Sequence, residues 1–348
     1  MAHVSRLSFV AFLATLLAHP LAQSNEPFKL GTFRQGSETF AGIVIADRHV
    51  ARLDKADPAL PRDLVEIISR YDELRSRLQA IANRVARPAD SRPAYVLDVT
   101  SLKIQPPIAP GTILNAAVNY TEHAQEMQRA ESTAAKPPAS IPGIWERKPG
   151  DPRHNPYLFM KARSAVIPDG ESIRIPPGRD RIDWECELSI VVGRRASRVP
   201  ADRAAEYIFG YTLQNDVSDR GGRADGRHGS DWLIGKSHDT FAPLGPFVVP
   251  REFVPDPQKL AIKFTLNGTV MQDSSTSRMT HNVYELLSYA SHIMTLGPGD
   301  VIATGSPAGV GTARETPIYM KPGDLAVCSI EWIGVLTNPV ASAAESKQ

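Results

Sequence analysis

The pattern of apolar and polar positions along the chain predicts many short strands and few helices. Residues 28–54 are typical of short strands separated by turns. From residue 111 onward, strands dominate the pattern and helices are few, without the regular alternation of strands and helices that a doubly wound sheet shows. We therefore expect a mainly β protein with some α, and not a doubly wound α/β sheet. Further apolar runs of strand length occur at 111–118, 185–193, 208–214, 246–249, 260–266, 300–304 and 325–333.

Three stretches have the features of helices. Residues 61–85 place apolar side chains near a spacing of 3.6. The segment NVYELLSYASHIM begins with Asn282, a suitable N-cap, and another helix is expected to begin at Ala201. The proline-rich stretch 85–111 then connects two units. We divide the chain into a small N-terminal domain at 23–105, a larger domain at 106–340 and a tail at 341–348.

The first 22 residues have the layout of a secretory signal peptide. Arg6 precedes an apolar core at 7–17, and small residues follow near Ala22. The apolar core is too short to span a bilayer comfortably, and the sequence contains no second one. We expect cleavage after Ala22 and a secreted or periplasmic protein with no membrane attachment. An uncleaved anchor or a buried helix is the alternative.

Composition and cysteine count narrow the class of protein. The chain is 42% apolar and 22% charged with a net charge of +1, as in ordinary soluble proteins, so nucleic acid is not an expected partner. Its two cysteines, Cys186 and Cys328, are too few for a disulfide scaffold. Because each lies within an apolar strand pattern, we expect two buried free thiols and not a bridge.

The segment DWECELSIVVG carries three acidic residues in alternation. On a strand, Asp183, Glu185 and Glu187 would share one face, where like charges about 7 Å apart repel one another. A divalent cation removes this repulsion, and Asp216 in GYTLQNDVSDR could supply a further oxygen ligand. The alternative is a solvated strand face with scattered charges.

Three other features could carry chemistry. His123 and Glu126 are three residues apart, so on a helical turn the carboxylate would orient the imidazole as a general base. An ordinary helix-surface pair is the alternative. Lys236 lies in an aromatic and glycine-rich segment, which favours a directed cation. The glycine-rich run at 304–311 is either a turn or a backbone nest that holds a carboxylate.

Seven segments, taken in order, resemble the fumarylacetoacetate hydrolase family over roughly 106–340: NYTEH, DWECELSIVVG, GYTLQNDVSDR, WLIGKSHDTFAPLGP, LNGTVMQ, LGPGDVIATGSPAGVG and KPGDLAVCSIEWIGVLTNPV. The resemblance implies a mixed β-sandwich roll preceded by a small α+β domain, commonly as a homodimer. It implies Mg²⁺, or Mn²⁺ or Ca²⁺, held by Glu185, Glu187 and Asp216. It also implies catalytic residues His123, Glu126 and Lys236, and substrate-binding residues Tyr120, Arg220, Thr304, Gly305 and Ser306.

The implied substrate is a small 2-oxo or dioxo carboxylic acid. The metal and Lys236 would stabilise an enolate while His123, backed by Glu126, takes a proton from water, so that a C–C bond of an acylpyruvate-like acid is hydrolysed. Decarboxylation, tautomerisation or other isomerisation, and hydration in aromatic catabolism are alternatives, as is a non-catalytic periplasmic binding protein for keto acids. Residues 129–156 are polar and proline-rich and follow the dyad, so we expect a lid there.

Overall fold

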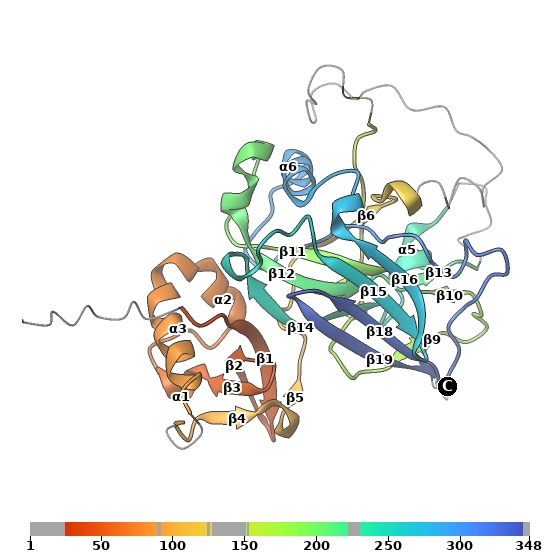
Figure 1. The fold of residues 1–348 in the computed structure, drawn as a ribbon. Helices are drawn as coiled ribbons and strands as arrows, with labels where there is room; N and C mark the ends of the chain where they lie inside the picture. Colours follow the sequence, from red (N-terminus) through yellow and green to blue (C-terminus); the bar gives the residue numbers. More distant parts are fainter. Residues whose placement is uncertain are drawn as a thin grey trace, which may run out of the picture.

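The protein, described here from a computed structural model, is mainly β, with a small unit of strands and helices beside a larger strand-rich unit (Figure 1). The structure describes residues 25–88, 92–123, 126, 151, 153–221 and 230–343. The predicted signal peptide at 1–22 lies outside these residues, as does most of the predicted lid at 129–156. No helix in the described part of the chain is long and apolar enough to cross a membrane.

The small unit packs an antiparallel sheet against three helices. The predicted helix at 61–85 is in fact two helices, because the backbone of Arg70 (φ −109°, ψ 18°) is not helical. Leu74, Leu78 and Ile81 of the second helix are buried with the apolar side chains of the sheet. The elements of this unit are β1 (Lys29–Gln35), β2 (Glu38–Ile45), β3 (His49–Arg52), α1 (Leu53–Ala56), α2 (Leu64–Ser69), α3 (Tyr71–Val85), β4 (Val96–Asp98) and β5 (Lys103–Ile104).

The sheet of the small unit continues into the larger unit. Leu30 of β1 pairs with Val248 of β14, and the strand order runs β4-β3-β2-β1-β14-β12-β11-β17-β6-β7. The strands beyond β1 are β6 (Ile113–Ala117), β7 (Tyr157–Met160), β8 (Val166–Ile167), β11 (Cys186–Val192), β12 (Ile208–Asn215), β14 (Ala242–Pro250) and β17 (Val301–Ala303). Every residue of β11, β12 and β14 is buried, as apolar runs of this length predict.

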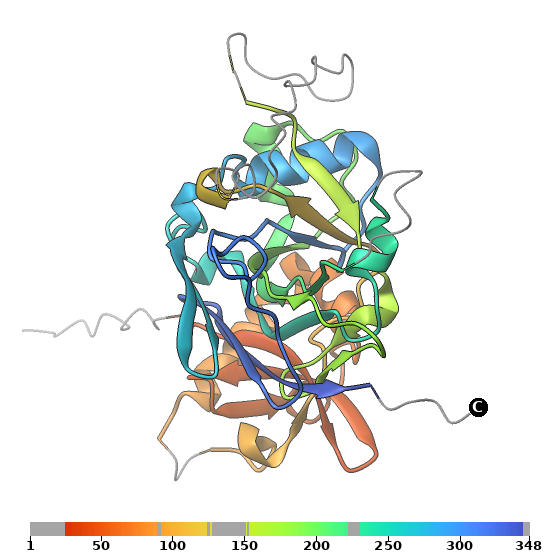
Figure 2. The same ribbon diagram turned by 90° about the vertical axis from the view of Figure 1, so that its right-hand side faces the viewer.

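A second sheet packs over the middle of the first (Figure 2). Trp184, just before β11, stacks on Phe264 of this sheet with ring centroids 5.3 Å apart. The stacked layers and the shared core confirm the predicted mixed β-sandwich roll. The strand order of the second sheet is β16 (Thr269–Ser275), β15 (Ala261–Leu266), β18 (Leu325–Ile330), β19 (Gly334–Ser342) and β9 (Ile173–Ile175), and a separate pair joins β10 (Ile182–Asp183) to β13 (Ser218–Asp219).

Two helices of the larger unit each begin directly after an N-capping residue. Helix α6 (Val283–Ile293) begins after Asn282, whose side chain accepts from the N–H of Tyr284 and Glu285 and completes a capping box. Helix α5 (Trp232–Lys236) begins at a cap made by Asp231. The helix predicted from Ala201 is a 3₁₀ segment, Ala201–Tyr207, and not an α-helix.

The prediction of two free thiols is wrong. Cys186 on β11 and Cys328 on β18 form a disulfide, with their Cα atoms 5.5 Å apart. The two cysteines are buried on facing sheets, where apolar surroundings suit a disulfide as well as a thiol. The bridge joins the two sheets at the residue between Glu185 and Glu187.

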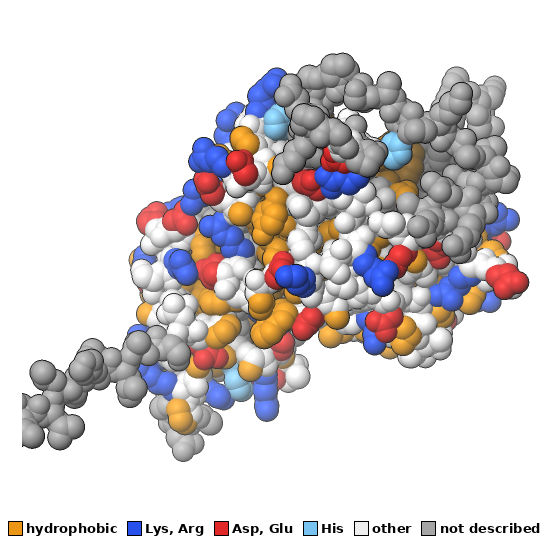
Figure 3. All heavy atoms as spheres, turned by 45° about the horizontal axis from the view of Figure 1, so that its top comes forward, with side chains coloured by type: hydrophobic (Ala, Val, Ile, Leu, Met, Phe, Trp, Pro, Cys, Tyr) orange, Lys and Arg blue, Asp and Glu red, His pale blue; other side chains and the backbone are white. Residues whose placement is uncertain are grey.

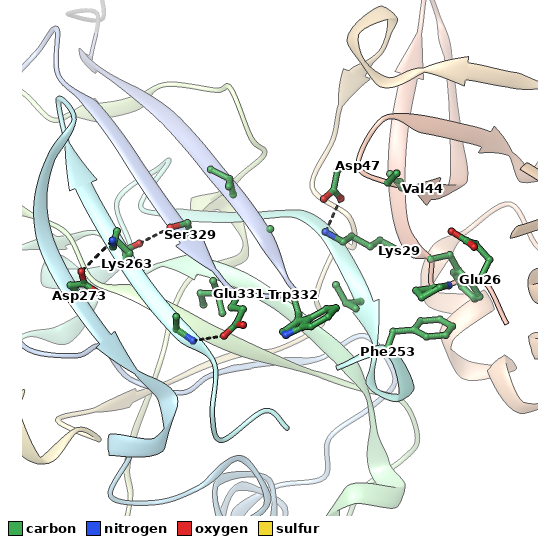
Figure 4. A pocket seen from close by; sticks show the side chains of 18 residues that line it. Glu26, Lys29, Val44, Asp47, Phe253, Lys263, Asp273, Ser329, Glu331 and Trp332 are labelled. Carbon is green, nitrogen blue, oxygen red and sulfur yellow. Dashed lines mark hydrogen bonds and ion pairs between the residues drawn. The ribbon is translucent and has the colours of Figure 1, made fainter. Parts of the chain in front are cut away.

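The surface shows no single-sign patch in the view of Figure 3, where acidic and basic side chains are interspersed over the described residues of that face. A hollow of about 690 Å³ lies between the two units, with Trp332 projecting into it (Figure 4). Its charged side chains include two ion pairs, Lys29–Asp47 at 2.7 Å and Lys263–Asp273 at 3.2 Å. None of the described residues that line this hollow is a predicted site residue, so we place the candidate chemistry elsewhere.

Candidate metal centre and active site

Three buried carboxylates converge at the ends of β11 and β12. Glu187 lies on β11 opposite Gln214 of β12, and this antiparallel register brings Asp216, just past β12, beside Glu185. The N–H of Asp216 donates to the carbonyl oxygen of Glu185 at 2.8 Å. One oxygen from each carboxylate lies within 4.8 Å of the others, and the three residues are 1–6% exposed. The alternative of a solvated strand face is therefore wrong.

Asp183 does not join this triad. It lies on β10, a separate strand, so the prediction that three carboxylates share one strand face is wrong. Its carboxylate accepts the N–H groups of Gly311 (2.6 Å) and Thr312 (3.1 Å) and the Nε–H of Arg220 (3.0 Å). Asp183 therefore holds a loop and an arginine in place.

Two buried lysines contact the triad. Lys236, the last residue of α5, places Nζ 2.6 Å from Glu185 Oε2 and 2.6 Å from Asp216 Oδ2. Lys161, just past β7, places Nζ 2.5 Å from Asp216 Oδ1. Burial lowers the pKa of Lys161 to about 8, with the charge of Lys236 acting in the same direction and Asp216 opposing both. Sequence reasoning missed Lys161, because its local sequence resembles that of any lysine at a strand end.

The surroundings shift the pKa values of two triad carboxylates in opposite directions. Burial opposes ionisation of Glu185, but Lys236, Arg220 and His123 together outweigh burial and hold its pKa well below the usual range. Burial, followed by the charges of Asp216 and Glu185, raises the pKa of Glu187 well above its usual range. Glu187 is thus the carboxylate whose negative charge the protein compensates least.

The triad fits a divalent cation of the Mg²⁺ or Mn²⁺ type. Such ions prefer several carboxylate oxygens at short distance, and the three side chains offer one oxygen each within 4.8 Å. Among the residues that the structure describes, the ion pairs of the triad and Asp183 are made with three cations, Lys161, Lys236 and Arg220, and none of these pairs includes Glu187. The excess negative charge at Glu187 is what a bound cation would offset.

The predicted dyad is present. His123 Nδ1 lies 3.1 Å from Glu126 Oε2, and His123 is only 4% exposed. Glu126 is held in turn by the backbone N–H of Gly309, at 3.1 and 3.2 Å from its two oxygens. An imidazole oriented in this way through Nδ1 keeps Nε2 for proton transfer.

The glycine-rich loop at 304–311 does form hydrogen bonds to carboxylates, but these belong to the protein itself. The N–H of Gly305 donates to Glu187 Oε2 at 2.8 Å, as that of Gly309 does to Glu126. Gly305 has φ +91°, and a Cβ there would lie 2.8 Å from the Cβ of Asn119, so only glycine fits. This loop therefore links a triad carboxylate to the dyad.

The remaining predicted substrate residues also lie around the triad. Tyr120 is fully buried, and its hydroxyl finds no hydrogen-bond partner among the described residues. Arg220 contacts both Glu185 and Asp183. Thr304 donates its hydroxyl to the backbone oxygen of Leu188. Roles for these residues and for Ser306 toward a substrate remain predictions.

Comparison with known proteins decides the family. A family model described as fumarylacetoacetate (FAA) hydrolase C-terminal matches residues 112–341. The chain belongs to this family. Fumarylacetoacetate hydrolase family members are enzymes, among them hydrolases, isomerases and tautomerases, as the relatives and neighbours below illustrate.

Similar proteins include a curated relative and two solved structures. Oxaloacetate tautomerase FAHD2A, mitochondrial, of Bos taurus is 34% identical over 292 residues, covering 84% of this chain and 83% of that protein. The 5-carboxymethyl-2-hydroxymuconate delta-isomerase of Mycobacterium smegmatis is 29% identical, with a TM-score of 0.64, and covers 91% of this chain and 100% of its own. Maleylpyruvate hydrolase of Sphingobium sp. SYK-6, in complex with manganese(II) and pyruvate, is 25% identical, with a TM-score of 0.66, covering 90% of this chain and 99% of its own.

The predicted location is corrected by these relatives. Curated family members that match 84% of the chain are named as mitochondrial enzymes, so the prediction of a secreted or periplasmic protein is wrong. That prediction was based only on the composition of the first residues, a basic residue followed by a short apolar run. These residues lie outside the described part of the chain, so no contact in the structure bears on it. A periplasmic binding protein is no longer a candidate. The homodimer remains a prediction.

Proposed function

We propose that this protein is a tautomerase, dependent on Mg²⁺ or Mn²⁺, that interconverts the enol and keto forms of a small 2-oxo dicarboxylic acid such as oxaloacetate. The observation that carries the proposal is the meeting of three buried carboxylates with two buried ammonium groups, Lys161 and Lys236. Relatives named as oxaloacetate tautomerases and a neighbour that holds manganese and pyruvate support the substrate class.

A divalent cation held by Glu185, Glu187 and Asp216 would supply concentrated positive charge to the oxygens of a 2-oxo acid, where negative charge develops as an enolate forms. Lys236 adds a second positive charge at the same place, because its ammonium group lies between two of the three carboxylates. Burial of the whole cluster excludes water and strengthens these interactions.

The proton needs a separate carrier. Enol-to-keto conversion removes a proton from the enol oxygen and delivers one to the adjacent carbon. His123 suits this transfer, since Glu126 fixes Nδ1 and Gly309 fixes Glu126. The Glu126 carboxylate would offset the positive charge that the imidazole gains while it carries the transferred proton.

Hydrolysis of a C–C bond in a 2,4-dioxo, acylpyruvate-like acid is the second candidate. The specific observation in its favour is the backbone support of Glu126, because a fully oriented dyad is what activation of a water molecule requires. Resemblance to maleylpyruvate hydrolase adds to this candidate. Both candidates would form an enolate that is finally protonated on carbon. Tautomerisation forms it by removing the proton of the enol oxygen, whereas hydrolysis forms it when water has attacked the distal carbonyl and the C–C bond breaks.

One assay distinguishes the two candidates. Enol oxaloacetate and an acylpyruvate are each mixed with the protein in Mg²⁺ or Mn²⁺, with chelator-treated protein and Glu187→Gln as controls. We expect faster loss of enol absorbance that requires metal, with no new carboxylic acid product. Cleavage of the acylpyruvate into two acids would favour the hydrolase. Equal rates with and without metal for both substrates would contradict both.

A further inference from the structure

One buried amide spans the gap between the strand of the triad and the loop that holds the dyad. Gln272, on β16 of the second sheet, is 1% exposed. Its Oε1 accepts the backbone N–H of Cys186 at 3.1 Å. Its Nε2 donates to Ser306 Oγ and to the carbonyl oxygen of Pro307, each at 2.7 Å. Both ends of the amide are therefore used.

The backbone N–H of Cys186, which donates to Gln272, has no hydrogen-bond acceptor on the neighbouring strand β17. Pairing of β11 with β17 begins only at Ser189, so the N–H of Cys186 lies beyond the end of that pairing. Cys186 is the residue between Glu185 and Glu187. A buried N–H left without an acceptor is costly, so the acceptor that Gln272 supplies also fixes the backbone between two triad carboxylates.

The loop side of the contact reaches both functional groups. Ser306 and Pro307 follow Gly305, which donates to Glu187, and precede Gly309, which donates to Glu126. The same loop approaches β16 closely: a Cβ on Gly309, at φ +104°, would lie 2.1 Å from the carbonyl oxygen of Met271. The loop is thus packed against the strand that carries Gln272.

We propose that Gln272 is a positioning residue for the reaction, which sets the spacing between the metal-ligating strand and the loop that orients Glu187 and Glu126. Gln272 contacts neither the triad nor the dyad side chains and acts through Cys186 on one side and Ser306 and Pro307 on the other. The inference rests on the proposed function only in assuming that triad and dyad serve one substrate.

The primary test uses Gln272→Met, which keeps the size of the side chain and removes both hydrogen-bonding ends. We expect Mn²⁺, measured by calorimetry on the unreacted protein, to bind about 10-fold more weakly, as is common when an outer partner of a ligand is lost. We expect kcat to fall about 10- to 100-fold while KM changes less than about 3-fold, because misplacement of Glu126 affects the proton transfer more than substrate binding.

Asn338 provides the matched control. It is also 1% exposed and donates two hydrogen bonds, to the carbonyl oxygens of Pro168 and Glu171, but it lies on β19 away from the loop. Asn338→Leu should lower the melting temperature as Gln272→Met does, with Mn²⁺ affinity and kcat within about 2-fold of wild type. Equal loss of kcat in both variants would mean that Gln272 is only structural.

A double-mutant cycle tests the contact between Gln272 and Ser306 directly. It keeps the inference testable even if Gln272→Met folds poorly. Ser306→Ala alone should lower kcat about 2- to 5-fold, whereas adding it to Gln272→Met should cost no more than Gln272→Met alone. Additive losses, or wild-type Mn²⁺ affinity and kcat in Gln272→Met, would overturn the inference. If wild type binds Mn²⁺ but turns over no 2-oxo acid, the proposed function fails, and Mn²⁺ affinity still decides the role of Gln272.

Discussion

The ammonium group of Lys236 lies 2.6 Å from Asp216 Oδ2, and both side chains are at most 2% exposed. Breaking a buried ion pair from one side leaves the other charge uncompensated. Lys236→Met should therefore destabilise the metal-free protein by about 3–5 kcal/mol, measured by urea unfolding. Added Mn²⁺ should raise the melting temperature more in this variant than in wild type, because the cation replaces the lost positive charge.

Lys259 offers a control for that experiment. Its side chain is 77% exposed and pairs with Asp256 at 3.0 Å. Lys259→Met should change the free energy of unfolding by less than about 1 kcal/mol, as is usual for exposed pairs, and should leave the Mn²⁺ response unchanged. A Lys236→Met protein as stable as Lys259→Met would contradict the ion-pair interpretation.

Glu187→Gln should separate metal binding from folding. The charge of Glu187 is the least compensated of the triad, so its neutral isostere should leave the metal-free protein at least as stable as wild type. Mn²⁺ affinity should fall at least about 10-fold and activity should be lost with it. Calorimetry with Mn²⁺ and thermal unfolding in chelator check the two parts. Exposed Glu206→Gln is the control, and full activity in Glu187→Gln would exclude the triad as the metal site.

His123→Ala addresses the dyad. Loss of a general base lowers kcat by about 10²–10⁴-fold, and the triad, which His123 does not join, should still bind Mn²⁺. Glu126→Gln should lower kcat by less, because Gly309 can still donate to the remaining amide oxygen. A near wild-type rate in His123→Ala would remove the dyad from the mechanism, whichever reaction the protein catalyses.

Stability at acid pH should depend on Glu285. Its carboxylate accepts from Arg153 at 2.8 and 3.0 Å, and although burial opposes ionisation, the neighbouring His281 and Arg153 lower its pKa from 4.5 to about 2. A depressed pKa gives stability that is present above 4.5 and is lost as the pH falls toward 2. The urea midpoint of wild type should fall more steeply across this interval than that of Glu285→Gln. Parallel curves would show that the carboxylate is not preferentially ionised in the folded state.

The sequence predicted those parts of the site that come from short local patterns. Glu185, just before β11, and Glu187 on β11 are two residues apart in sequence, and His123 and Glu126 are three apart, so each pair is recognisable without the fold. Lys161 and Gln272 were missed because their partners are 55 and 86 residues away. No periodicity marks a contact of that range.

Sheet-to-sheet relations were harder still to predict. Apolar runs at 185–193 and 325–333 predicted β11 and β18 correctly, but not that these strands face each other. The Cys186–Cys328 bridge spans 142 residues and depends wholly on that packing. The break at Arg70 was missed for the opposite reason, because apolar spacing continues through it while the backbone does not.

The pairing of Leu30 with Val248 has a consequence for how this protein can be divided. Val191, Phe209, Val248 and Val301 of the larger unit are buried in the same apolar cluster as α2 and α3. Removing the first hundred residues would therefore expose that cluster and leave an unpaired, apolar edge on β14, which is a template for aggregation. We therefore expect the segment at 112–341, which matches the family model, to fold stably only when another strand pairs with β14 and other apolar side chains cover that cluster.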